Sequence, residues 1–445
     1  MAGNSRGNCG RPWWKRAVVT LTRAVLAGAV LAASGVGMMT PAWAKKPQPA
    51  PAPRSAPPTS SVLVNNYVRI GVVTSRTGRL ALPSRPMAQA LELTAQRIDD
   101  SGGIALNDRK VMVELVFVDD RSTVEKAREQ AAALAKDPDI MAVIAPYSSD
   151  MVLEVRDEAE KVGLPVLNAV GAAPTLHRVR DEQWMFGIGS AANGYFAPVL
   201  EAAARRMAAG HAMRVGVAYQ DDLFGRAIGA WTESELQRTG IPASFVQVLS
   251  RSADLSSLFE VVQREHPNVL IFSANDAEMT RNFVTGLAEK RINIDMLAVS
   301  GCRAAGLEKL GTPAEYIVCP VQWDGLADYA DPYWGHSTQF MSSFEVAFGA
   351  EPTYQAAQAA ASLVVIAKAL ERAGKLDRTA LRRALAETDM ETLFGSVRFG
   401  PDGRNSAVKP LLEQVRGGGY MTVLPQEQAW VPLVGQMPVW KDRLP

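Results

Sequence analysis

The sequence predicts an α/β fold of two similar lobes, each with a parallel sheet covered by helices on both faces. Short β-branched runs alternate with amphipathic stretches of helical period from about Val68 onwards. The connections between them are short, and strand–helix alternation with short connections requires parallel sheets. The alternation runs through two consecutive series of about 120–135 residues, each the size of one domain. We therefore expect two lobes.

The first series begins with Val68–Thr74 (VRIGVVT), a run typical of a buried strand. The helix that follows is expected over Met87–Asp100, and Gly102 and Gly103 mark its end. The remaining strands are expected at 111–118, 140–145, 165–169 and 184–188, and the remaining helices at 123–135 and 151–162.

The second series repeats this rhythm. Its strands are expected at 214–219, 244–249, 269–273, 296–300 and 316–320, and its helices at 195–208, 224–238, 255–265 and 278–290. After Trp323 helices dominate from 339 to 386, and strands follow at 396–399, 411–415 and 420–424. Proline and glycine turns separate these last strands.

The N-terminus has the pattern of a signal peptide over residues 1–44. A basic stretch ends at Lys15-Arg16, an apolar run follows from about Ala24 to Met39, and Ala42-Trp43-Ala44 gives the small-x-small cleavage pattern. The alternative is a retained membrane anchor, but ~16 apolar residues are fewer than the ~20 that span a bilayer. Residues 45–62, rich in Pro, Ala and Ser, are expected to be an extended linker.

Charge and motifs exclude several function classes. Five basic side chains and no acidic one fall in the first 44 residues, which leaves 42 basic and 46 acidic side chains in the rest. This mildly acidic body lacks the basic face that nucleic-acid binding needs. The four histidines have no metal-ligand spacing, and no complete nucleophile elbow, dinucleotide loop or P-loop occurs. We expect no enzyme, no cofactor and no metal.

Four segments carry a family resemblance over residues 68–423. They are Gly71–Gly78 (GVVTSRTG), Ile98–Lys110 (IDDSGGIALNDRK), Val143–Ser149 (VIAPYSS) and Phe394–Phe399 (FGSVRF). In this order they resemble the type I periplasmic binding proteins of the leucine/isoleucine/valine-binding group.

The resemblance implies two Rossmann-like lobes joined by a hinge. Residues 63–190 plus 326–394 would form lobe 1, and residues 191–325 plus 395–445 would form lobe 2 with a C-terminal extension. Such a protein captures a small ligand between its lobes in the periplasm and delivers it to the permease subunits of an ABC importer in the inner membrane. The alternative is a periplasmic sensing module that reports to a membrane regulator. We expect a monomer in either case.

The resemblance also implies ligand-binding residues. Ser149 takes the place of a serine that holds the carboxylate of a bound amino acid, and Val170 and Ala172 lie in a second carboxylate-contacting loop, where relatives usually have a hydroxyl. Phe224 stands where relatives often carry Tyr. Relatives have an acidic residue that pairs with the ligand's ammonium group at about the position of Gly301, so this chain lacks that carboxylate. The full expected set is Arg76, Tyr147, Ser148, Ser149, Val170, Ala172, Phe224, Asn275, Asp276 and Trp323.

Structural alternatives stand beside several of these residues. Ser148 or Ser149 could cap the next helix, Asp276 could cap the helix at 278–290, and Phe224 could belong to the core. Arg76 and Arg303 could face an acidic ligand or only solvent.

Removal of the signal peptide leaves Cys302 and Cys319 in a compartment that permits disulfides. Each lies at or near the carboxyl end of a strand, and the two strands are successive. Because successive parallel strands are usually neighbours, we expect a disulfide between them. The alternative is two buried free thiols.

We predict cleavage after Ala44, because the basic start, the apolar run and the Ala-Trp-Ala ending together form a signal-peptidase site. N-terminal sequencing of the exported protein should begin at Lys45. A membrane-bound product that retains residues 1–44 would contradict this prediction.

Overall fold

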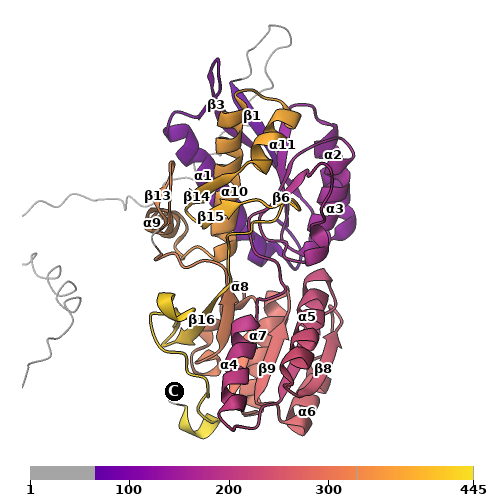
Figure 1. The fold of residues 1–445 in the computed structure, drawn as a ribbon, viewed down its shortest axis with the longest axis vertical. Coiled ribbons are helices and arrows are strands. Elements are labelled where there is room, and N and C mark those ends of the chain that lie inside the picture. Colours follow the sequence, from indigo (N-terminus) through magenta and orange to yellow (C-terminus); the bar gives the residue numbers. More distant parts are fainter. Residues whose placement is uncertain (1–65, 328, 444–445) are drawn as a thin grey trace, which may run out of the picture. The chain divides into compact units, whose positions relative to one another are not determined.

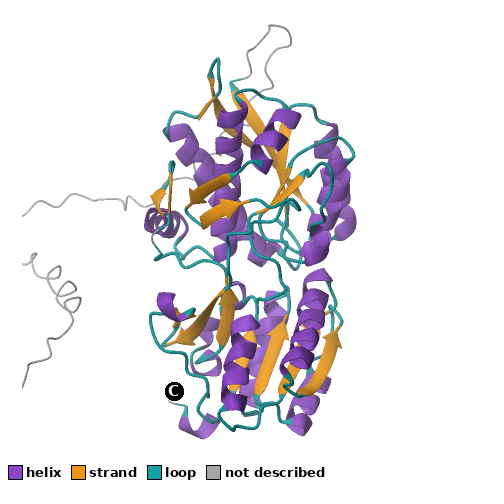
Figure 2. Ribbon diagram, viewed as in Figure 1, coloured by secondary structure: helices purple, strands orange, loops and turns teal. Residues whose placement is uncertain are grey.

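The computed structural model describes residues 66–327 and 329–443 (Figure 1). The expected signal peptide at 1–44 and linker at 45–62 lie outside these residues. Two sheets, each mainly parallel, are flanked by helices (Figure 2), so the predicted two-lobed α/β fold is confirmed.

The first sheet has six strands in the order β2-β3-β1-β4-β5-β6, and only β2 is antiparallel to its neighbour. Alternate residues of β1 point to opposite faces: Ile70 and Val72 pack in the core that contains α1 and α10, and Val73 packs on the side of α2 and α3. The strands are β1 (Tyr67–Thr74), β2 (Ile104–Ala105), β3 (Lys110–Asp119), β4 (Ile140–Ile144), β5 (Val166–Asn168) and β6 (Met185–Gly187).

The helices of the first lobe come from two separate parts of the chain, and α1 packs directly against α10 (Figure 1). The first of them begins at Ala81, six residues before the expected start, although Pro86 lies inside it. Pro86 has no N–H, so the helix forgoes one internal hydrogen bond there. The helices are α1 (Ala81–Asp100), α2 (Val124–Lys136), α3 (Ser149–Glu160), α9 (Ser337–Phe348), α10 (Tyr354–Ala373) and α11 (Arg378–Ala386).

The second sheet has seven strands in the order β17-β16-β11-β10-β9-β7-β8. Its first five strands along the chain are parallel, and β16 and β17 add an antiparallel edge. The strands are β7 (Val215–Gln220), β8 (Ala243–Leu249), β9 (Val269–Ser273), β10 (Met296–Val299), β11 (Val318–Val321), β16 (Leu411–Arg416) and β17 (Gly419–Leu424). The helices are α4 (Ala197–Ala208), α5 (Leu223–Thr239), α6 (Ser256–Glu265), α7 (Ala277–Glu289) and α8 (Cys302–Ala305).

The two sheets share one topology. In each, the first strand lies between the next two parallel strands of the chain: β1 lies between β3 and β4, and β7 lies between β8 and β9. The chain therefore switches direction between β1 and β4 in one lobe and between β7 and β9 in the other. Ligands of open α/β sheets bind at such switch points, beyond the carboxyl ends of the strands.

A hairpin of β14 (Asp389–Thr392) and β15 (Gly395–Arg398) belongs to the first lobe, because Phe394, Val397 and Phe399 pack in its core. We therefore propose that the third crossing between the lobes lies between Phe399 and Leu411, later than the boundary at 394 that the sequence led us to expect. A short hairpin of β12 (Ala330–Asp331) and β13 (Gly335–His336) precedes α9.

The crossings between the lobes are tied together by polar contacts. The Ser190 backbone N–H donates to the Gln322 amide oxygen, and the Gln322 amide nitrogen donates to the Tyr195 hydroxyl. Asn405 Nδ2 donates to the Ile188 carbonyl at 3.0 Å. These contacts join all three connecting segments, as a hinge requires.

The C-terminal segment after β17 packs back on the second lobe. Gln414 Nε2 donates to the Val434 carbonyl at 3.0 Å, and Arg206 Nη1 donates to the Gly435 carbonyl at 2.9 Å. Trp440 Nε1 donates to the Ile292 carbonyl at 2.7 Å. The tryptophan-containing extension is thus a structural cover of the second lobe.

Among residues 66–327 and 329–443, no helix has the length and apolar character needed to cross a membrane. The same residues contain no group of three or more His, Cys, Asp or Glu side chains that could hold a metal ion.

Cys302 at the start of α8 and Cys319 on β11 are joined by a disulfide, with their Cα atoms 6.1 Å apart. The neighbouring strands β10 and β11 are parallel, as the sequence argument assumed. The two cysteines are 17 residues apart in the sequence.

We predict that the denatured, unreduced mature protein has no thiol that iodoacetamide can alkylate. Replacing both cysteines (Cys302→Ser with Cys319→Ser) should lower the free energy of unfolding by about 3 kcal/mol, because a closed loop of this size restricts the unfolded chain. Mass spectrometry and denaturant titration check the two expectations, and the reduced wild-type protein is the control. Two alkylated thiols before reduction would contradict the prediction.

Candidate ligand-binding site

The candidate site lies where the switch points of the two sheets meet. Ser148 and Ser149 follow β4 in the first lobe, and Asn275 follows β9 in the second. These loops join side chains of both lobes around one small pocket. Its lining consists of Tyr147, Ser148, Ser149, Val170, Tyr195, Phe224, Ala274, Asn275, Ser300, Gly301, Tyr354 and Gln355.

The pocket has a volume of about 20 Å³, which is room for one water molecule. Aromatic side chains fill most of the space between the loops: Tyr195 and Phe224 are in edge-to-face contact, with their ring centroids 5.6 Å apart. A solute larger than water can enter only if the lobes part or these rings move.

The β4–α3 corner supplies the hydroxyls of the first lobe. Ser148 has a φ of 85° and makes no capping hydrogen bond, so it is a non-glycine residue held in the left-handed region. Ser149 Oγ accepts a hydrogen bond from the Ala173 N–H at 3.1 Å, which leaves the Ser149 hydroxyl proton available to a ligand. Neither serine therefore acts as the simple side-chain cap of α3.

Two buried tyrosines, Tyr147 and Tyr195, and the partly buried Tyr354 bring phenol groups to the wall. Burial raises the pKa values of Tyr147, Tyr195 and Tyr354 above the ordinary value for a phenol. All three are therefore protonated at neutral pH and can donate a hydrogen bond. Tyr195 and Tyr354 share a hydrogen bond with each other.

The second lobe contributes an amide and an open backbone position. Asn275 Nδ2 donates to Asp222 Oδ2 at 2.8 Å, and Asp222 Oδ1 accepts from the Gly225 N–H at 2.7 Å. Asp222 is 3% exposed, and burial raises the pKa of its carboxyl. Gly301 has a φ of 73° and brings no side chain to the pocket. No acidic side chain lines this pocket.

Two further contacts cross between the lobes beside the pocket. Asp150 Oδ2 accepts from Arg251 Nη2 at 2.9 Å, and Asp150 Oδ1 accepts from the Leu223 N–H at 3.4 Å. Arg79, in the loop after β1, is near enough to the carboxylates of Asp150 and Asp222 to interact electrostatically with them. Burial, with the nearby positive charge of Arg251, lowers the Arg79 pKa, and Arg79 Nη1 is buried with no hydrogen-bond partner among the described residues.

The structure brings six of the ten expected site residues together in this pocket: Tyr147, Ser148, Ser149, Val170, Phe224 and Asn275. The other four lie elsewhere. Ala172 is in the core of the second lobe. Asp276 caps α7 by accepting from the N–H groups of Glu278 and Met279.

Arg76 and Trp323 also lie outside the pocket. The Arg76 guanidinium lies over the Phe117 ring, 4.8 Å from its centroid, and lines a separate surface cavity. Trp323 is 5% exposed and donates from Nε1 to the Leu393 carbonyl at 2.9 Å, so its ring supports the first lobe.

Sequence reasoning missed Tyr195, Tyr354, Gln355 and Arg79. Tyr354 and Gln355 begin α10, about 200 residues after the β4–α3 corner that they face. The run Thr353–Gln355 gives only a helix-start signal, since Thr353 Oγ1 caps α10. One sequence feature could have pointed to Arg79 as a site residue. The loop Gly78-Arg79 follows β1, and loops at the carboxyl ends of such strands form the ligand sites of open α/β sheets.

Comparison with known proteins agrees with this architecture. The family model described as periplasmic binding protein matches residues 67–417. A relative from Brucella abortus, Leu/Ile/Val-binding protein homolog 8, is 21% identical over 383 residues, which cover 81% of this chain and 91% of the relative.

Solved structures share the fold at low identity. A leucine-binding protein from Thermotoga maritima superposes with a TM-score of 0.68 at 17% identity, covering 80% of this chain and 97% of that one. A solute-binding protein of an ABC transporter from R. palustris, solved in complex with benzoate, gives 0.67 at 17% identity over 80% and 95% of the two chains.

The family match spans the first sheet, the second sheet up to β16, and every segment that lines the pocket. The chain belongs to the periplasmic binding protein family, and within it the chain is similar to the leucine/isoleucine/valine-binding proteins.

Proposed function

We propose that this protein captures a small solute between its two lobes in the periplasm and delivers it to the permease subunits of an ABC importer. The observation that carries the proposal is the pocket at the paired switch points, which both lobes line with hydroxyl, phenol and amide groups. Side chains from two lobes can all contact one solute only when the lobes close on it.

The contacts between the lobes support a closing motion. The ion pairs Asp150–Arg251 and Arg303–Glu351 and the Asp150 contact to Leu223 join the lobes outside the lining of the small pocket. Exposed ion pairs are worth about 0–1 kcal/mol, so the lobes can separate at small cost. The three connecting segments, joined through Gln322 and Asn405, remain as the hinge.

The named relatives bind different solutes. One structural neighbour is described as a leucine-binding protein, another was solved with isoleucine, and a third with benzoate. The common element is a small organic solute with a carboxylate. We propose that the solute of this protein belongs to this broad class.

We predict that a solute found by a thermal-shift screen of amino acids, amides and aromatic and aliphatic acids lowers the radius of gyration in small-angle scattering. Deleting the gene should abolish uptake of that labelled solute by intact cells. A tight solute that leaves both the scattering and the uptake unchanged would contradict the proposal, and loss of a transcriptional response alone would favour the sensing role.

The variant Ser148→Gly distinguishes an effect on solute affinity from an effect on the stability of the fold. Ser148→Gly removes the hydroxyl and relieves the positive φ, so the free energy of unfolding should stay within about 1 kcal/mol of the wild type or rise. A solute held in the small pocket should bind roughly tenfold or more weakly, because one hydrogen bond to a charged group is worth about 1.5–3 kcal/mol. His266→Gly, at an exposed position with a φ of 44°, is the matched control and should leave affinity unchanged.

We predict that plain Leu, Ile or Val binds more weakly than micromolar. The pocket has no acidic side chain in its lining for an ammonium, and Gly301 and Phe224 bring no polar group. Each missing hydrogen bond to a charged group costs about 1.5–3 kcal/mol, or one to two powers of ten in the dissociation constant. Calorimetry checks this, and a micromolar or tighter constant for any of the three would contradict it.

A further inference from the structure

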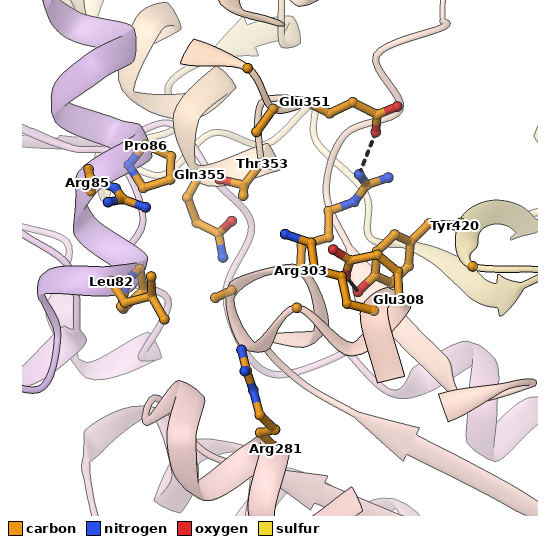
Figure 3. A pocket seen from close by; sticks show the side chains of 18 of the residues that line it. Leu82, Arg85, Pro86, Arg281, Arg303, Glu308, Glu351, Thr353, Gln355 and Tyr420 are labelled. Atoms are coloured by element: carbon orange, nitrogen blue, oxygen red, sulfur yellow. Dashed lines mark hydrogen bonds and ion pairs between the residues drawn. The ribbon is translucent and has the colours of Figure 1, made fainter. Parts of the chain in front are cut away.

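A second cavity adjoins the small pocket, and its volume is about 600 Å³. Gln355 lines both cavities. The walls come from both lobes: α1 and the loop before α10 on one side, and α7, α8 and the β16–β17 turn on the other (Figure 3). We call this space the lateral cavity.

The lining of the lateral cavity is rich in basic groups. Four basic side chains face two carboxylates, those of Glu308 and Glu351. Both carboxylates have partners in the protein: Glu308 Oε2 accepts from the Tyr420 hydroxyl at 2.8 Å, and Glu351 Oε2 accepts from Arg303 Nη1 at 3.1 Å. The basic side chains are Arg85, Arg281, Arg303 and Lys309.

The Arg303 guanidinium has partners within the protein on every side. Its Nη2 and Nε donate to the two oxygens of the buried Glu413 carboxylate at 2.8 and 3.2 Å, and its guanidinium lies over the Tyr420 ring, 4.4 Å from the centroid. With Glu351 as a third partner, Arg303 forms part of the wall and is not free to bind a solute.

The other three cations have no carboxylate. Arg281 donates twice to the Ala305 carbonyl, at 3.0 and 2.7 Å from Nε and Nη2, and its Nη1 has no partner in the described part of the chain. The side chains of Arg85 and Lys309 form no hydrogen bond or ion pair with any described residue. In Figure 3, Arg85 extends from α1 and Arg281 from the opposite lobe.

Gln355 is a second, independent sign of a ligand. It is 4% exposed, and its amide has no hydrogen-bond partner among residues 66–327 and 329–443. Figure 3 shows this amide pointing into the space between α1 and Arg303. The backbone and stem of Gln355 are covered, while its amide keeps access to the cavity and has donors and an acceptor to offer there. A bound solute would supply the missing acceptor.

We propose that the lateral cavity binds an organic solute with an anionic oxygen group, carboxylate or phosphate, recognised by Arg281 and Arg85 with Gln355 as a hydrogen-bond donor. The small pocket holds about one water molecule, whereas the lateral cavity has room for a ligand the size of a small organic acid. A concave wall with unpaired cations concentrates anions, and a guanidinium matches the geometry of carboxylate and phosphate. This inference rests on the proposed function and names the solute class.

The experiment compares matched solutes and matched variants by calorimetry. The probes are aliphatic and aromatic mono- and dicarboxylates, organic phosphate monoesters, and the neutral amides of the same acids. We expect one acid or phosphate series to bind at least tenfold tighter than its amides and to weaken as salt is raised. Whether the carboxylates or the phosphate monoesters bind more tightly shows which of the two anionic groups the cavity recognises.

Arg281→Gln, which can still donate to the Ala305 carbonyl, and Arg85→Gln on exposed α1 should each weaken the anionic solute about tenfold or more. Gln355→Leu should weaken it as well, while the melting temperature stays the same or rises because an unpaired amide is removed. Arg264→Gln, on α6 and outside both cavities, is the control and should change nothing.

Three outcomes would overturn the inference. One is an anionic solute whose affinity is unchanged in both arginine variants. The second is binding of neutral or zwitterionic solutes alone, weakened by Ser148→Gly, which leaves the proposed function intact and assigns binding to the small pocket. The third is no binding by any acid or phosphate in the panel. The proposed function itself fails only if no solute of any class binds and deletion of the gene leaves uptake unchanged.

Discussion

The geometry of parallel sheets is the constraint on which the rest of this structure depends. Parallel strands gather their carboxyl ends at one edge, and the reversal of strand order between β1 and β4, and again between β7 and β9, opens a crevice at that edge. The loops that follow these strands carry Ser148, Asp222 and Asn275. Because the two lobes have the same topology, two crevices contribute to one site.

Polar side chains at the hinge hold the connecting segments together by hydrogen bonds. Gln322 links the first and second connecting segments, and Asn405 links the third to Ile188. Most of each apolar core lies within one lobe. The apolar contacts between the lobes include Ala172 of the first lobe, which packs in a core of the second, and Leu223 of the second lobe, which packs against a core of the first. Most of the free energy of apolar burial therefore belongs to the lobes themselves, and ion pairs such as Asp150–Arg251 add to the contacts between them.

The two cavities differ in how their polar groups are satisfied. Around the small pocket, phenols, Asn275 and Asp222 pair with one another, and the space left is the size of a water molecule. Around the lateral cavity, Arg281, Arg85 and Gln355 keep unpaired donors facing open space. Arg85 and Arg281 are exposed, so water satisfies their free donors until an anionic group takes its place. We therefore propose that Arg281 and Arg85 of the lateral cavity select a negative charge, whereas beside the small pocket the cation Arg79 lies near the carboxylates of Asp150 and Asp222.

The sequence by itself determined the elements, the parallel sheets, the two lobes and the neighbouring strands that bring Cys302 and Cys319 together, because strand and helix periodicity are local properties. It also placed Ser149 and Asn275 at strand ends. Its alternative for Asp276, a cap of the next helix, is a local contact and is confirmed. Only the tertiary structure decided which distant groups meet: it packed Trp323 against the first lobe and brought Tyr354 and Gln355 from a distant helix into the site. The physical reason is that side-chain packing between lobes joins residues hundreds of positions apart, and no local pattern records such a contact.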